Sequence, residues 1–189
     1  MIITGIGTRE PNRTQELTEI VKLFCGVANK NGWTLRSGAA PGMDNWFEQL
    51  WKGPKEIYIP RERYTPEGLP TRYHGYDGAI NVTDPEILRK AFNIASNIHP
   101  NWKACNPGAR ALHTRNVFQI MGQDLQSNAN AIVYYAKYDR DGVSVKGGTR
   151  TAVHLGRKLN IPEYNLILPD DIDRLIDFME SHLCPATKP

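Results

Sequence analysis

The hydrophobic positions along the chain form two kinds of pattern, short continuous runs and longer sets with helical spacing. Continuous apolar runs predict strands that are covered on both faces of a sheet. The five predicted strands lie at residues 2–7, 33–35, 55–60, 130–135 and 164–168. Apolar positions at helical spacing predict amphipathic helices. The predicted helices lie at about residues 14–30, 45–51, 86–98, 109–125 and 151–159, and from residue 170 onward.

Strands and helices alternate over most of this pattern. That order favours a mainly parallel sheet of about five strands with helices on both faces, so the predicted fold class is α/β. In the predicted helix at 109–125, Arg115, Asn116 and Gln119 fall on a different face from the apolar residues. Ligands of such sheets bind beyond the carboxyl ends of the strands.

The alternation is interrupted between about residues 61 and 110. This part contains charged, aromatic and glycine-rich stretches, and Asp84 followed by Pro85 marks the start of the helix at 86–98. A segment of this length inside a compact domain favours a lid-like or interaction element. The alternative is a surface elaboration that packs against the sheet edge. Within the segment, Tyr73, His74 and Tyr76 either stack on a base or simply pack a loop.

Composition narrows the class of protein. A chain of 189 residues, 40% hydrophobic and 23% charged, fits a single globular domain spanning 1–189. The net charge of +3 permits an anionic ligand but is too small to argue for nucleic acid. Cys25, Cys105 and Cys184 are odd in number and widely spaced, which suggests reduced thiols in a cytoplasmic protein without a metal or cofactor. We expect neither a signal peptide nor a membrane span.

Glycine-containing turns follow three of the predicted strands. Such turns bind phosphate where the backbone approaches the anion and free N–H groups at a helix start point toward it. The residues that supply this chemistry are Gly7, Gly38, Gly42, Lys146, Gly147, Gly148 and Thr149, with Arg115 as a bidentate donor. The alternatives are plain connecting turns and a solvated helix arginine.

Two acids lie one helical turn apart, at Asp44 and Glu48. Near the anomeric carbon of a nucleotide, a carboxylate could stabilise an oxocarbenium ion or activate water. As an alternative, Asp44 caps its helix and Glu48 is a solvated surface acid.

Three stretches resemble the SLOG superfamily, the Rossmann-like group that includes DNA-processing protein A and the LOG-type (lonely guy) nucleoside-monophosphate phosphoribohydrolases. Residues 7–9, Gly-Thr-Arg, resemble the Gly-Ser-Arg of the DNA-processing branch, and residues 37–44 resemble its Ser-Gly-x-Ala-x-Gly-Ile-Asp. Residues 112–116, Leu-His-Thr-Arg-Asn, resemble the LOG Met-His-x-Arg-Lys. The resemblance covers residues 1 to about 168, apart from 61–109. The chain as a whole is also similar to phage-encoded members of the superfamily. The resemblance implies a three-layer Rossmann-like fold.

The resemblance adds Thr8, Arg9, Ser37, Asn116 and Thr151 to the expected ligand-binding residues, and it implies a homodimer or a higher oligomer. The LOG motif Pro-Gly-Gly-x-Gly-Thr-x-x-Glu is not kept. Residues 146–154 read Lys-Gly-Gly-Thr-Arg-Thr-Ala-Val-His, so Arg150 replaces the third glycine and His154 replaces the catalytic glutamate.

Two classes of function therefore remain open. The first is an enzyme that cleaves the N-glycosidic bond of a nucleoside 5′-monophosphate, with Arg115, Glu48 and Asp44 as catalytic residues. The second is a non-enzymatic protein that sequesters a nucleotide signal or binds single-stranded DNA. In both classes the expected partner is a nucleotide-like molecule. Any DNA binding is expected to be weak and mainly electrostatic.

Overall fold

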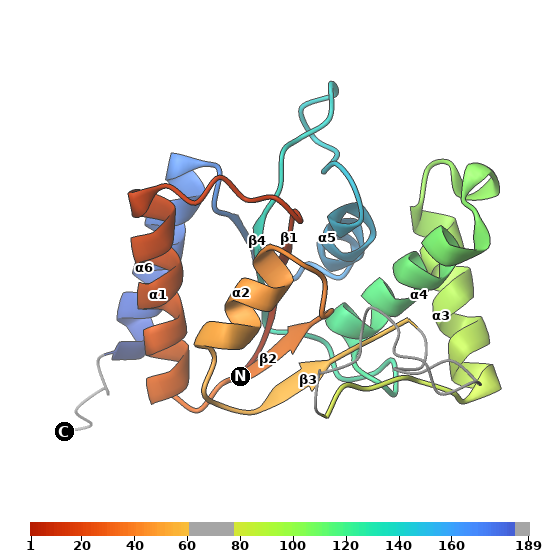
Figure 1. Ribbon diagram of the computed structural model, residues 1–189, viewed down its shortest axis with the longest axis horizontal. Helices are drawn as coiled ribbons and strands as arrows, with labels where there is room; N and C mark the ends of the chain where they lie inside the picture. The colour runs from red at the N-terminus through yellow and green to blue at the C-terminus, as the bar shows by residue number, and fades with distance from the viewer. Residues whose placement is uncertain (61–77, 184–189) are drawn as a thin grey trace.

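The computed structural model of the protein describes residues 1–60 and 78–183. Over these residues the chain forms one five-stranded parallel sheet with the order β3-β2-β1-β4-β5 (Figure 1). The strands are β1 (Ile2–Gly7), β2 (Thr34–Ser37), β3 (Lys55–Ile57), β4 (Ala131–Tyr135) and β5 (Glu163–Asn165). The predicted α/β class and the Rossmann-like three-layer arrangement are confirmed.

Two hydrophobic cores lie on opposite faces of the sheet. One contains the buried sides of α1 (Gln15–Lys30), α2 (Met43–Leu50) and α6 (Pro169–Leu183). The other is formed with α3 (Pro85–Ile98), α4 (Pro107–Met121) and α5 (Thr149–Lys158). Figure 1 shows the two sets of helices on either side of the strands. None of the helices in the described ranges is long and apolar enough to cross a membrane.

The helix starts follow from local side-chain chemistry. The Thr14 hydroxyl accepts a hydrogen bond from the Leu17 N–H and caps α1. Asp84 accepts from the N–H groups of Glu86 and Ile87 at the start of α3, where Pro85 occupies the first turn. Both starts were predicted from sequence.

Helix α4 differs most from its prediction. It runs from Pro107 to Met121 rather than to residue 125, because Gly122 ends it with a φ of +74°. The polar face predicted for it is buried as well: Arg115, Asn116 and Gln119 are all at most 5% exposed. Residues 113–120 of this helix are all buried, so its C-terminal half lacks the amphipathic signal from which a boundary is placed.

The segment predicted as an excursion at about 61–110 is described in part. Within it, α3 packs along α4 and buries Ala91 and Ala95 in the core of that face. The short 3-10 helix η1 (Trp102–Ala104) then leads into α4. Residues 61–77, including Tyr73, His74 and Tyr76, lie outside the described residues.

The turn before α2 depends on Gly42. Its φ is +90°, and a Cβ at this position would lie 2.4 Å from the backbone oxygens of Thr8 and Arg9. The turn and the segment after β1 cannot move apart easily, because the Met43 N–H donates a hydrogen bond to Thr8 O at 3.1 Å and joins them. Gly42 is therefore required for packing between this turn and the end of β1.

We expect Gly42→Ala to lower the free energy of unfolding by about 3 kcal/mol, from backbone strain and overpacking. The matched control is Gly26→Ala, in the exposed side of α1, where a Cβ would meet nothing within 4 Å. That variant should gain about 0.5–1 kcal/mol. Urea unfolding of both variants tests the prediction, and a Gly42→Ala protein as stable as the wild type would contradict it.

Candidate ligand-binding site

A cavity of about 1000 Å³ opens at the carboxyl ends of β1 and β4. The strand order reverses between these two neighbouring strands. Beyond β1 lie β2 and β3, and beyond β4 lies β5. Gly7 pairs with Tyr135 at the last position of the register, and both line the cavity. In doubly wound sheets this crevice is where ligands bind.

Most of the residues expected to bind a ligand line this cavity. They are Gly7, Thr8, Arg9, Asp44, Arg115, Asn116, Lys146, Gly147, Gly148 and Thr149. Five other candidates are absent from its lining, namely Ser37, Gly38, Gly42, Glu48 and Thr151. The turn before α5 is thus at the cavity, whereas most of the turn before α2 lies behind its wall.

The turn at 146–149 presents backbone and side-chain donors to the cavity. Gly147 has a φ of +74°, and no atom lies within 4 Å of a Cβ built on Gly147 or Gly148. The Asn116 side chain donates to Gly148 O and holds the turn against α4. Among the hydrogen bonds between described residues, none uses the N–H groups of Gly147, Gly148 or Thr149. These donors are available to an anion at the start of α5.

The turn before α2 has a packing role. A Cβ on Gly38 would lie 1.3 Å from Arg115 Nη1, so the absence of a side chain there makes room for the guanidinium. Ser37 is fully buried, and its hydroxyl donates to Gly5 O at 2.6 Å. From this stretch, Ala40 and Asp44 reach the cavity lining.

Arg115 and Asp44 form a buried charge pair at the base of the cavity. Arg115 Nη1 lies 4.0 Å from Asp44 Oδ2 and donates to Tyr58 O at 3.2 Å. Asp44 Oδ1 accepts from the Gly7 N–H at 3.1 Å. Burial raises the pKa of Asp44 to about 6, although Arg115 and backbone N–H groups act to lower that pKa. A carboxyl group in this condition exchanges a proton near neutral pH.

Glu48 does not line the cavity, although it lies one turn from Asp44 on α2. It is half-buried, and burial raises its pKa, while Lys55 opposes the shift and the charge of Asp44 adds to it. Its Oε2 atom is buried without a hydrogen-bond partner among the described residues. His154, at the position of the LOG glutamate, is half-buried on α5 and also does not line the cavity.

The exposed rim of the cavity carries more cations than carboxylates, although Glu10 and Asp139 also line it. Arg9, Lys137 and Lys146 are exposed lining residues, and none of them forms an ion pair with a described residue. Arg150 also lines the cavity, but its guanidinium is held by Asp139 Oδ2 at 2.7 Å and by Val145 O at 2.8 Å. The rim therefore favours an anionic ligand.

Several lining residues were not selected from the sequence: His99, His113, Gln119, Tyr135, Lys137 and Arg150. His113 stands in the Leu-His-x-Arg-Asn stretch, which was the signal that could have found it. Burial lowers the pKa of His113 to about 4, and the charges of His99, Arg115 and Arg150 act in the same direction. Its Nδ1 lies 2.8 Å from the hydroxyl of Thr151, which was expected to bind the ligand itself.

No family model matches the chain, and no curated protein matches it. A solved structure that matches is DNA processing protein A from Helicobacter pylori, described for its mode of binding single-stranded DNA. The alignment covers 97% of this chain and 80% of that chain, with 13% sequence identity and a TM-score of 0.47. At this level of likeness, what that protein binds says nothing about the ligand of this chain.

Proposed function

We propose that the cavity binds a nucleotide-derived small molecule through its phosphate. The observation that carries the proposal is the turn at 146–149, which lines the cavity at the strand-order reversal and whose Gly147, Gly148 and Thr149 N–H groups have no hydrogen-bond partner among the described residues. A phosphate there accepts hydrogen bonds from this turn and from the Thr149 hydroxyl, and the start of α5 favours its negative charge. Lys146, Lys137 and Arg9 add cations around the same opening.

The volume supports a ligand larger than phosphate alone. Small-molecule sites in proteins commonly measure about 300–1000 Å³, and this cavity lies at the upper end of that range. With the phosphate at the α5 turn, the sugar and base extend toward β1, where Thr8, Asn12 and Tyr135 offer polar groups and a ring. This arrangement suits a nucleoside monophosphate or an ADP-ribose-like molecule.

Asp44 makes N-glycosidic cleavage the second candidate function. It is an acid that lines the cavity, and its pKa of about 6 suits proton transfer at neutral pH. In this account Asp44 assists departure of the base or activates water, while Glu48 takes no part. Release of free base from a nucleotide panel measures the activity, and Asp44→Asn should reduce turnover by orders of magnitude while ligand affinity is kept.

Calorimetric titration tests the binding proposal with nucleoside monophosphates, ADP-ribose, inorganic phosphate and a short single-stranded oligonucleotide. We expect saturable heat for at least one nucleotide, and Lys146→Ala should weaken that binding about 10-fold, the equivalent of about 1.4 kcal/mol. The matched control is Lys158→Ala, which removes the same charge at the far, exposed end of α5 and should leave affinity unchanged.

Two results would contradict the proposal. The first is the absence of heat for every small molecule at millimolar concentration. The second is binding of the oligonucleotide alone, which would favour the single-stranded DNA alternative. Loss of binding in Lys158→Ala to the same degree as in Lys146→Ala would show that affinity depends on net charge rather than on this turn.

A further inference from the structure

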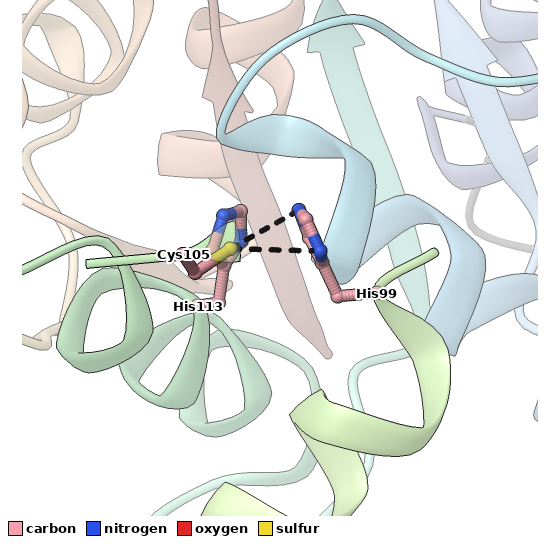
Figure 2. Close-up of side chains that lie close together, drawn as sticks. All are labelled: His99, Cys105 and His113. Carbon is pink, nitrogen blue, oxygen red and sulfur yellow. Dashed lines mark hydrogen bonds between the residues drawn. The ribbon is translucent and has the colours of Figure 1, made fainter. Parts of the chain in front are cut away.

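Three potential metal ligands converge at one wall of the cavity. His99 follows the last turn of α3, Cys105 follows η1, and His113 lies in α4. Figure 2 shows their side chains pointing toward one another from these segments. One nitrogen of each histidine and the cysteine sulfur all lie within 4.8 Å of one another. Imidazole nitrogen and thiolate sulfur are the ligands that zinc prefers.

The separation of Cys105 Sγ from the nearer His99 nitrogen is close to that of two ligands on one ion. Zinc binds sulfur at about 2.3 Å and nitrogen at about 2.0–2.1 Å, so a tetrahedral ion holds such a pair about 3.6 Å apart. Cys105 Sγ lies 3.7 Å from His99 Nδ1 and 3.9 Å from His99 Nε2 (Figure 2). The His99 and His113 ring centroids are 4.4 Å apart, so the two imidazoles are in contact beside the sulfur.

A neighbouring hydroxyl group can hold His113 in the tautomer that binds a metal ion. The Thr151 hydroxyl is fully buried and lies 2.8 Å from His113 Nδ1. When Nδ1–H donates to this hydroxyl, the Nε2 lone pair of His113 is left for a metal. A hydrogen bond at the second ring nitrogen is the usual support of a zinc-bound histidine.

We propose that His99, Cys105 and His113 bind a zinc ion whose fourth coordination position opens into the cavity. His99 and His113 both line the cavity, so an ion between them and Cys105 stands at its wall. Three protein ligands with one open position is the arrangement of zinc sites that act on a bound molecule, whereas structural zinc sites have four protein ligands. This proposal does not depend on nucleotide binding, because zinc affinity is measured without any nucleotide.

A different account of the same cluster is an aromatic packing group with a thiol–imidazole hydrogen bond. Trp102 supports it, since its ring centroid lies 6.1 Å from that of His99 and 6.3 Å from that of His113. The two accounts differ in what they predict. Only a metal site takes up zinc with defined stoichiometry and protects Cys105 from alkylation.

The experiment uses the full chain, stripped of metal by a chelator and then titrated with zinc and, separately, with cobalt. We expect one zinc ion per chain. Cobalt should give a thiolate-to-metal charge-transfer band and the strong visible bands of a tetrahedral site. In the wild type, zinc should also slow alkylation of Cys105, located by mass spectrometry.

Variants assign the site to these residues. Cys105→Ser should abolish the charge-transfer band, whereas Cys25→Ala, which removes a buried thiol of the opposite core, should keep it. Thr151→Val should keep the stoichiometry but weaken zinc binding by about 10–100-fold. Circular dichroism shows whether each variant is folded, and the wild-type alkylation result holds even if a variant is not.

The proposal is overturned if the wild type binds neither ion with defined stoichiometry and its Cys105 is not protected. It is equally overturned if folded Cys105→Ser binds zinc as tightly as the wild type. Loss of nucleotide binding with intact zinc binding, or the reverse, would separate this site from the function proposed above.

Discussion

Replacement of Arg115 by alanine is expected to lower the free energy of unfolding by about 3–5 kcal/mol at pH 7.5. The guanidinium is 5% exposed and lies 4.0 Å from Asp44, which is itself 4% exposed. Without it, Asp44 must either stay ionised without its partner or take up a proton, a void is left beside it, and Tyr58 O loses a donor. Guanidinium chloride unfolding measures the loss.

A control variant and a change of pH test whether the loss of stability comes from the charge of Arg115 beside Asp44. Arg89→Ala removes an exposed arginine of α3 and should change stability by less than about 0.5 kcal/mol. At pH 5, where Asp44 is largely protonated, the cost of Arg115→Ala should be smaller than at pH 7.5. An equal cost at both pH values would mean that Arg115 stabilises the fold through packing and not through Asp44.

The second large effect is a loss of stability as Asp44 ionises. Its pKa is about 6 in the native protein, raised from an ordinary value of 3.8 mainly by burial. The native state therefore holds this proton more tightly than the unfolded chain does. The resulting stability is fully present below about pH 4 and is lost as the pH rises through 6. The expected loss is about 3 kcal/mol, from a shift of about two pKa units.

Unfolding curves of the wild type and Asp44→Asn between pH 4 and pH 7.5 measure this effect. The histidines and the other acids titrate in both proteins, so the difference between the two curves isolates Asp44. We expect that difference to change by about 3 kcal/mol across the range, with the wild type losing stability relative to the variant. Parallel curves would show that Asp44 keeps an ordinary pKa.

The fold was predictable because most of its elements carry a one-sided or continuous apolar pattern. The run at β1 and the helical spacing in α1 are examples, and the cap Asp84 placed the start of α3. Helix α4 was not predictable in the same way. Its residues 113–120 are all buried, so polar residues among them, such as Arg115 beside Gly38, do not mark a solvent-facing side.

The lining of the cavity was predictable where a motif lies at a strand end, as with Gly7 and the turn at 146–149, whereas ligand binding there remains a prediction. Similar glycines before α2 have a different role, since Gly38 makes room for Arg115 and Gly42 allows contact with Thr8. Sequence cannot separate these uses, because each depends on what packs opposite the glycine. The nearness of His99 and Cys105 to His113 likewise depends on how α3 packs along α4.

The central claim is that a nucleotide phosphate binds at the turn before α5, beside the end of β1. Amide ¹H–¹⁵N correlation spectra recorded during titration with nucleoside monophosphates test it directly, because glycine signals are well separated. We expect the signals of Gly7, Gly147 and Gly148 to shift together and to saturate, while those of Gly26 and Gly53, away from the cavity, stay in place. Saturable shifts confined to other residues, or no shifts at millimolar nucleotide, would contradict the claim.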